Sequence, residues 1–238
     1  MKAPSSTTFA LLGAALIAIS YGLARFAFGL FVPPIREELE LTSYVVGIIG
    51  ALPLISFVFA TMVAPLAAVR LGARNTAMAS GVFGAIGLGL ISQASGAISL
   101  GIGVIACGIC TGLMMPALTA AMQALVDRSV HGRVSSVMNA GTSVGVAVAV
   151  PAVLLMAGEW RYAYMAFAGL AVLGLVATWF FIPSVSRITP ANAAQPPISA
   201  QQWWKLLRLS LFAFAMGFVS AAYWIFAPDL ASTLGALP

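Results

Sequence analysis

Arg25 is the one charged residue inside the first long apolar run of this sequence, and about 17 residues of that run precede it. Tyr21 lies one helical turn earlier, on the same face of a helix. If the run crosses a bilayer, an arginine at this depth costs roughly 2.5–3.5 kcal/mol unless it faces water or a partner. Arg25 would then bind an anionic group or pair with a carboxylate. The alternative is an arginine that snorkels along its own stem to the outer interface.

Polar side chains in three later apolar runs also share helix faces. They are Thr119 with Gln123, Asn139 with Thr142 and Ser143, and Ser220 with Tyr223 and Trp224. The simpler interpretation is interhelical hydrogen bonding, worth about 0.6 kcal/mol on average. Asn139 and Tyr223 are the better candidates for lining a central pocket with Arg25. Tyr21, Tyr223 and Trp224 would give a ligand apolar contact.

The sequence offers little for covalent or metal chemistry. Cys107 and Cys110 form a CxxC pair inside an apolar run, without a second pair or a nearby histidine, so packing is the simpler interpretation and a redox or zinc pair the alternative. The chain has one histidine. No apolar run carries paired carboxylates or a nucleophile with its base, which argues against an enzyme. We therefore predict no metal and no cofactor.

The composition identifies lipid as the solvent for most of the chain. Of 238 residues, 61% are hydrophobic and 7% are charged, whereas soluble proteins have about 25% charged residues. The mean hydropathy is +1.04. So few charges cannot cover a water-facing surface, which excludes a soluble enzyme, a nucleic-acid binder and a disordered protein. The net charge of +5 is better explained by topology signals at helix ends than by nucleic acid.

Seven apolar runs are long enough to cross a bilayer, which takes about 20 residues as a helix. They cover about 8–32, 44–67, 75–92, 98–125, 134–157, 162–182 and 206–228. The runs are too long for strands and lack the alternation of a membrane barrel. The sequence therefore predicts an all-α membrane protein with about seven transmembrane helices.

The basic residues predict an orientation. The N-terminal segment and the second, fourth and sixth loops hold eight of the eleven lysines and arginines, and the other three loops hold two. By the positive-inside rule the N-terminus is cytoplasmic in a multi-pass protein of the inner membrane. Residues 1–182 then form a six-helix unit, 183–205 a cytoplasmic linker, and 229–238 an outer tail. Similar spacing in the first and second three runs permits an inverted repeat.

The loop after the second run resembles the signature G-x-L-A-D-R-x-G-R-R/K of the major facilitator superfamily. Arg70, Gly72 and Arg74 match it, whereas Pro65 and Val69 replace its first glycine and its aspartate. The resemblance implies a cytoplasmic gating loop that lacks the gating aspartate.

Other segments resemble the same family. They are Gly108–Pro116 (a glycine-rich stretch, with Val104 in place of an arginine), Asn139–Gly145 (the antiporter glycine motif), Trp160–Tyr164 (the W-R-x-x-F entry to the sixth helix), and Tyr21–Pro34 with Tyr223–Asp229 (a bacterial subfamily of uncertain substrate). In that subfamily Arg25 belongs to the pattern.

The resemblance implies a helical bundle truncated relative to the family's twelve helices: an N-terminal six-helix half plus the seventh helix. In the family the first, fourth and seventh helices line the cavity. We therefore expect transport of a small-molecule substrate by alternating access, with the lipid bilayer and the missing C-terminal half as partners. Arg25, Tyr21, Asn139, Tyr223 and Trp224 are the expected binding residues. The alternative is a non-transporting membrane fragment or assembly partner.

Overall fold

A computed structural model describes residues 4–183 and 199–233, without the side chains of 157, 200, 217, 218 and 220–233. Helices make up these two segments, which contain no strand. In chain order they are α1 (Ser6–Ile17), the π-helix η1 (Ala18–Phe26), α2 (Ala27–Glu38), α3 (Ser43–Leu71), α4 (Ala73–Ser92), α5 (Ala97–Leu125), the 3-10 turn η2 (Arg128–Val130), α6 (His131–Met156), the 3-10 turn η3 (Ala157–Glu159), α7 (Trp160–Phe181) and α8 (Ala200–Thr233). The predicted all-α fold class is confirmed.

Among the described residues, six helices are long and apolar enough to cross a membrane. The first comprises α1, η1 and α2 as one continuous helix, Ser6–Glu38, here called the first span. It continues past the expected end at Val32 to Glu38. Pro33 and Pro34 lie inside α2 and do not end it. α8 belongs to a second compact unit and is described by itself. Its role as a seventh span stays a prediction. α8 begins inside the expected linker 183–205 and ends inside the expected tail 229–238, so the helix is longer at both ends than the expected 206–228. Residues 184–198 and 234–238 lie outside the described part of the chain.

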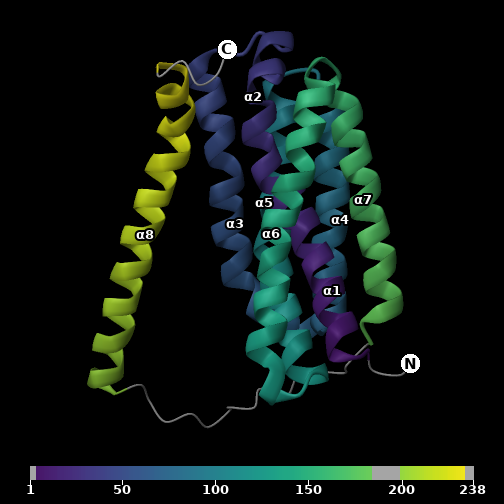
Figure 1. Cartoon of the computed structure of the whole chain (residues 1–238), viewed down its shortest axis with the longest axis vertical. Helices are drawn as coiled ribbons and strands as arrows, with labels where there is room; N and C mark the ends of the chain where they lie inside the picture. Colours follow the sequence, from purple (N-terminus) through teal and green to yellow (C-terminus); the bar gives the residue numbers. More distant parts are fainter. Residues whose placement is uncertain (1–3, 184–198, 234–238) are drawn as a thin grey trace. The chain divides into compact units, whose positions relative to one another are not determined.

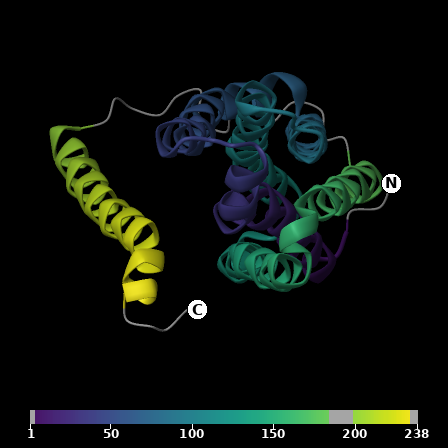
Figure 2. The ribbon, with the colours of Figure 1, turned by 90° about the horizontal axis from the view of Figure 1, so that it is seen from above.

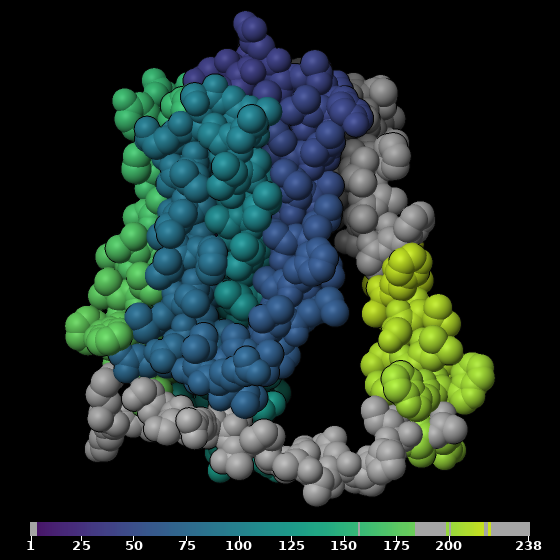
Figure 3. All heavy atoms as spheres, turned by 180° about the vertical axis from the view of Figure 1, so that it is seen from behind, coloured from purple at the N-terminus to yellow at the C-terminus, as the bar shows by residue number. Residues whose placement is uncertain are grey.

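The first span runs through the middle of the six-helix unit. Figures 1 and 2 show it in side view and end-on, and its η1 segment contacts α4, α5, α6 and α7. On the face seen in Figure 3, α5 lies between α3 and α4. The middle of the first span therefore has α4, α5, α6 and α7 as neighbours.

The outer faces of the unit are apolar, as a lipid solvent requires. Large hydrophobic side chains such as Phe59, Met62 and Leu154 are exposed.

Inside the unit, Phe31 of α2 meets Tyr164 and Phe167 of α7 at ring-centroid distances of 5.4 and 6.3 Å. Tilted and edge-on aromatic pairs of this kind add stabilisation beyond the area they bury. They join the second half of the first span to the start of α7.

Backbone-to-backbone contact joins the first span to α6. A Cβ atom built on Gly22 would lie 2.4 Å from Cα of Gly145, and one on Gly141 would lie 2.1 Å from the carbonyl oxygen of Ala14. Only glycine permits this approach. Since lipid supplies little hydrophobic drive between helices, such close contacts provide the packing attraction. The crossing also fixes the rotation of the first span about its axis.

We expect Gly22→Ala to destabilise the protein, because its methyl group meets backbone that cannot move aside; overpacking of this kind typically costs about 1–3 kcal/mol. Gly29→Ala, on the same helix, is the matched control, since a Cβ there meets nothing within 4 Å. Thermal unfolding in detergent should show a lower Tm for the first variant and an unchanged or higher Tm for the second. Equal Tm values would contradict the proposed crossing.

Candidate functional site

A π-helical segment sits at the centre of the first span. Ala18–Phe26 has the wider turn of a π-helix, and the N–H of Ala27 donates to the carbonyl of Gly22, five residues back. The hydroxyl of Thr111 on α5 donates to the carbonyl of Cys107 on its own helix at 2.7 Å and also lies 3.3 Å from the carbonyl of Ser20. π-Helical turns are rare and often mark functional sites. This one contains both Tyr21 and Arg25.

Arg25 points from the π-helical segment toward α3. Its guanidinium carbon lies 4.7 Å from the ring centroid of Phe57 and 5.5 Å from that of Phe26. Phe57 is the central residue of α3, which has 29 residues. The charged group is therefore level with the middle of a membrane-length helix. This position supports the functional interpretation of Arg25 over the snorkelling one, in which the group would reach a helix end.

Aromatic rings, and no carboxylate, surround Arg25 in the described part of the chain. The ring of Tyr21 meets Phe57 edge-on, with centroids 6.5 Å apart and planes at 83°. The ion pair found among the described residues joins Arg161 to Glu38 and does not involve Arg25. A cation–π contact is worth roughly 0.5–2 kcal/mol, less than the cost of placing an arginine deep in a bilayer. A ligand that neutralises the charge would lower that cost.

The structure brings Tyr21 to Arg25 but not Asn139. The contact between Gly141 and Ala14 sets the level of α6 against the first span, and Asn139 lies two residues below it. Arg25 is eleven residues above Ala14, so the two side chains are separated by roughly 15–20 Å along the helix axes. The amide of Asn139 donates to the carbonyl of Ser135, one turn back on its own helix. A binding role for Asn139 at the level of Arg25 is not supported.

Tyr223 and Trp224 lie on α8, and their side chains are outside the described part of the structure. Their expected place beside Arg25 stays a prediction.

The expected gating loop forms the tight turn between α3 and α4. Gly72 has φ 85°, in the region that favours glycine, and its carbonyl accepts hydrogen bonds from the backbone N–H and the hydroxyl of Thr76. The guanidinium carbon of Arg74 lies over the ring of Trp179 of α7, 4.1 Å from its centroid, while Arg70 is exposed. Gly72 thus forms the turn, and Arg74 contacts α7. A gating role for Arg70, Gly72 and Arg74 stays a prediction.

The two cysteines face α4 as small packing residues. A Cβ on Gly84 would lie 2.9 Å from Sγ of Cys110, and one on Gly87 would lie 2.8 Å from Sγ of Cys107. The hydroxyl of Ser80 donates to the carbonyl of Cys110 at 2.6 Å. The described residues hold no group of three or more His, Cys, Asp or Glu side chains arranged for a metal ion.

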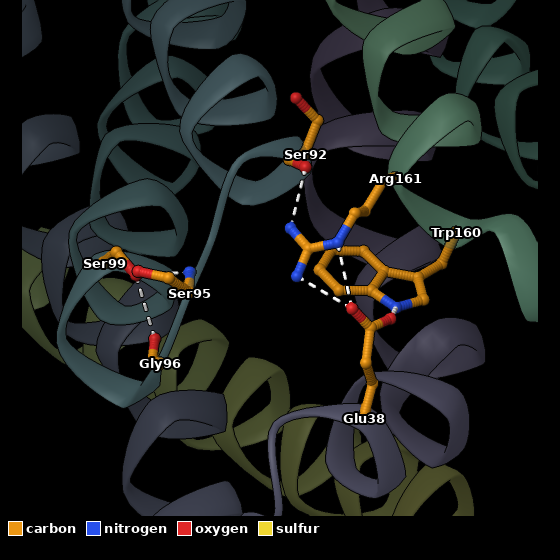
Figure 4. Close-up of polar contacts among 7 residues, drawn as sticks. All are labelled: Glu38, Ser92, Ser95, Gly96, Ser99, Trp160 and Arg161. Atoms are coloured by element: carbon orange, nitrogen blue, oxygen red, sulfur yellow. Dashed lines mark hydrogen bonds and ion pairs between the residues drawn. The ribbon is translucent and has the colours of Figure 1, made fainter.

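Three helix ends are joined by the end clamp, our name for Glu38, Trp160, Arg161 and the carbonyl of Ser92 (Figure 4). Arg161 donates twice to Oε1 of Glu38, at 2.9 and 3.0 Å, and once to the carbonyl of Ser92, at 3.1 Å. The indole N–H of Trp160 donates to the other carboxylate oxygen. The clamp ties the end of the first span to the end of α4 and the start of α7.

The end clamp places each of its two charges beside an opposite one. Glu38 is the last residue of α2 and Arg161 is the second residue of α7, where the dipole of each residue's own helix opposes its charge, and the ion pair offsets this. The hydroxyl of Ser99 bonds the carbonyl of Gly96 and accepts the N–H of Ser95, which closes the turn into α5.

Sequence reasoning missed Phe57 and Thr111, because each is an unremarkable residue within an apolar run. It also missed the end clamp, although a signal was present. Glu38 lies between the predicted runs 8–32 and 44–67, and Arg161 lies between 134–157 and 162–182, so the predicted topology puts both on the same side of the membrane, where opposite charges can pair. No signal in the sequence marks the π-helical turn.

Fold and site together define a multi-pass helical membrane protein with a charged group at the middle of its central helix. Residues 14–236 match the Major Facilitator Superfamily, and the chain belongs to that family. It is 27% identical over 195 residues to a Bacillus subtilis (strain 168) protein called "Uncharacterized transporter YycB". The match covers 80% of this chain and 47% of the relative, so the chain spans about half the length of that protein.

We expect Arg161→Met to lower the Tm in detergent more than Glu38→Gln does. The first change removes all three bonds made by the guanidinium and leaves a helix-end carbonyl without its donor. The second breaks an ion pair whose side chains are 36% and 45% exposed, worth at most about 1 kcal/mol. Glu40→Gln, in the adjacent turn, should leave Tm unchanged. A larger effect of Glu38→Gln than of Arg161→Met would refute this account.

Proposed function

We propose that the chain works in secondary transport and moves a small solute across the cytoplasmic membrane by alternating access, with efflux as one direction of movement. The observation that carries the proposal is a guanidinium held level with the middle of a membrane-length helix in a member of the Major Facilitator Superfamily. A buried charge at mid-membrane is costly and marks a solute or ion pathway by default. The relative named as a transporter supports the same class.

Arg25 and Tyr21 would form the first-helix side of the solute site. Arg25 binds an anionic group of the solute or pairs with a carboxylate during the cycle, and Tyr21 supplies apolar contact. Tyr223 and Trp224 of α8 would contribute from the seventh helix. Asn139 would act lower along the pathway than Arg25, given its level on α6.

The proposed orientation places the N-terminus and the even-numbered loops in the cytoplasm, as the distribution of basic residues indicates. The turn that holds Arg70, Gly72 and Arg74 then lies on the cytoplasmic side, where it would act in gating. A C-terminal half, corresponding to the unmatched part of the relative, is the proposed partner for closing the cavity.

Arg25→Ala should abolish most transport while leaving membrane insertion normal, because the variant removes the charge that the site is built around. Uptake and efflux would be measured in vesicles with labelled organic anions, amines and sugars. Arg133→Ala, an exposed arginine at the start of α6, is the matched control and should transport normally. Transport that survives in Arg25→Ala would remove the proposed site. An inserted chain that moves none of these solutes would favour the alternative of a non-transporting fragment or assembly partner.

A further inference from the structure

Aromatic rings lie close to the Arg25 guanidinium. Its central carbon is 4.7 Å from the ring centroid of Phe57 and 5.5 Å from that of Phe26. A cation–π contact supplies no acceptor lone pair, so it does not satisfy the N–H donors of the guanidinium. The side chain is half-buried, so part of it remains accessible.

Those N–H donors have no acceptor in the described part of the chain. None of the hydrogen bonds among the described side chains involves Arg25, whereas Arg161 makes three. A planar group with two acceptor oxygens matches the edge of a guanidinium through two parallel hydrogen bonds. The geometry therefore fits a carboxylate better than a hydroxyl or an amide.

The local charge balance fits an anion with a single charge. Arg25 is the one ionised residue within the six predicted spans of residues 1–182. One carboxylate would neutralise it, whereas a dianion would leave a net negative charge at the same depth, and a cation would be repelled. In a low-dielectric region an uncompensated charge of either sign is costly.

The surroundings of the guanidinium are aromatic. Tyr21 and Phe57 meet edge-on, and Phe26 is 37% exposed. Rings arranged in this way pack well against a flat apolar body, at centroid distances of about 4.5–7 Å. A short aliphatic acid would neutralise the charge but offer the rings of Tyr21 and Phe57 no flat apolar surface.

We infer that the solute is an aromatic or similarly flat apolar monocarboxylate, held by the N–H edge of Arg25 and by the rings of Tyr21 and Phe57. This inference rests on the proposed function, since it names the solute class of that same site. It commits Arg25 to the ligand, where the proposed function left a protein carboxylate as the other possibility.

The test measures equilibrium binding to the purified chain in detergent at pH 7, with labelled benzoate as the probe. Competitors are benzamide (the neutral isostere), acetate (no ring), phthalate (a dianion) and benzylamine (a cation). We expect saturable benzoate binding that benzamide and benzylamine do not displace. Acetate and phthalate should bind at least about tenfold more weakly.

Variants assign the binding to the named residues. Arg25→Met should weaken benzoate binding about 10- to 100-fold, and Arg25→Lys less, because an ammonium keeps the charge without the planar fork. Phe57→Leu should weaken it severalfold, and Arg133→Met should leave it unchanged. Size-exclusion profile and Tm verify that each variant is folded. Should Arg25→Met not fold, the benzoate and benzamide comparison on the unmodified chain still decides the matter.

The inference is overturned if benzoate shows no saturable binding, if benzamide competes as well as benzoate, or if folded Arg25→Met binds benzoate normally. Measuring uptake by vesicles distinguishes failure of this inference from failure of the proposed function. Transport of an amine or a sugar, with no carboxylate binding, refutes the solute class and keeps the transporter. Arg25-dependent benzoate binding without transport of any solute supports the site and refutes the transport proposal.

Discussion

A positive charge placed level with the middle of a lipid-facing helix constrains everything around it. An arginine at this depth is costly unless it faces water or a partner, so the groups beside Arg25 contribute to its stabilisation. Phe57 provides a cation–π contact, and the described residues near it provide no carboxylate. The η1 segment of the first span contacts α4, α5, α6 and α7, and Arg25 points from it toward Phe57 of α3, with its side chain half-buried. A ligand of opposite charge would complete this stabilisation.

Close contact with α6 decides which way Arg25 points. Gly22, Gly141 and Gly145 let two backbones touch, and this contact leaves the first span a single rotational setting. Tyr21 and Arg25 are on another side of the helix and meet Phe57 of α3. The π-helical turn adds to this setting, because a wider turn shifts the residues that follow it around the axis. The hydroxyl of Thr111, which donates to the carbonyl of Cys107 at 2.7 Å, lies 3.3 Å from the carbonyl of Ser20 in that turn. The packing of the first span against α6 therefore positions Tyr21 and Arg25 on another side of the same helix.

The sequence was sufficient for the fold class, because hydropathy runs and helix length are direct consequences of the lipid solvent. It also singled out Arg25, since a charge inside an apolar run is visible without a structure. It was insufficient for the neighbours of Arg25. Phe57 is one aromatic residue among many, and its facing of Arg25 depends on the relative rotation of two helices. Asn139 shows the same difficulty: polarity marked it as a candidate, but its level along α6 depends on where Gly141 meets the first span.

Arg25 and Arg161 differ in their surroundings. This difference explains why Arg25 suits ligand binding and Arg161 suits the joining of helix ends. Arg161 is at a helix end, where its partner Glu38 is partly exposed and the pair needs little desolvation. A permanent ion pair there ties helices together at low cost. The same pair at mid-depth would need two desolvated charges held in good geometry at all times, and removal of either would be strongly destabilising. A guanidinium that rests on an aromatic ring avoids a fixed counter-charge and keeps its N–H edge available for an anion that comes and goes.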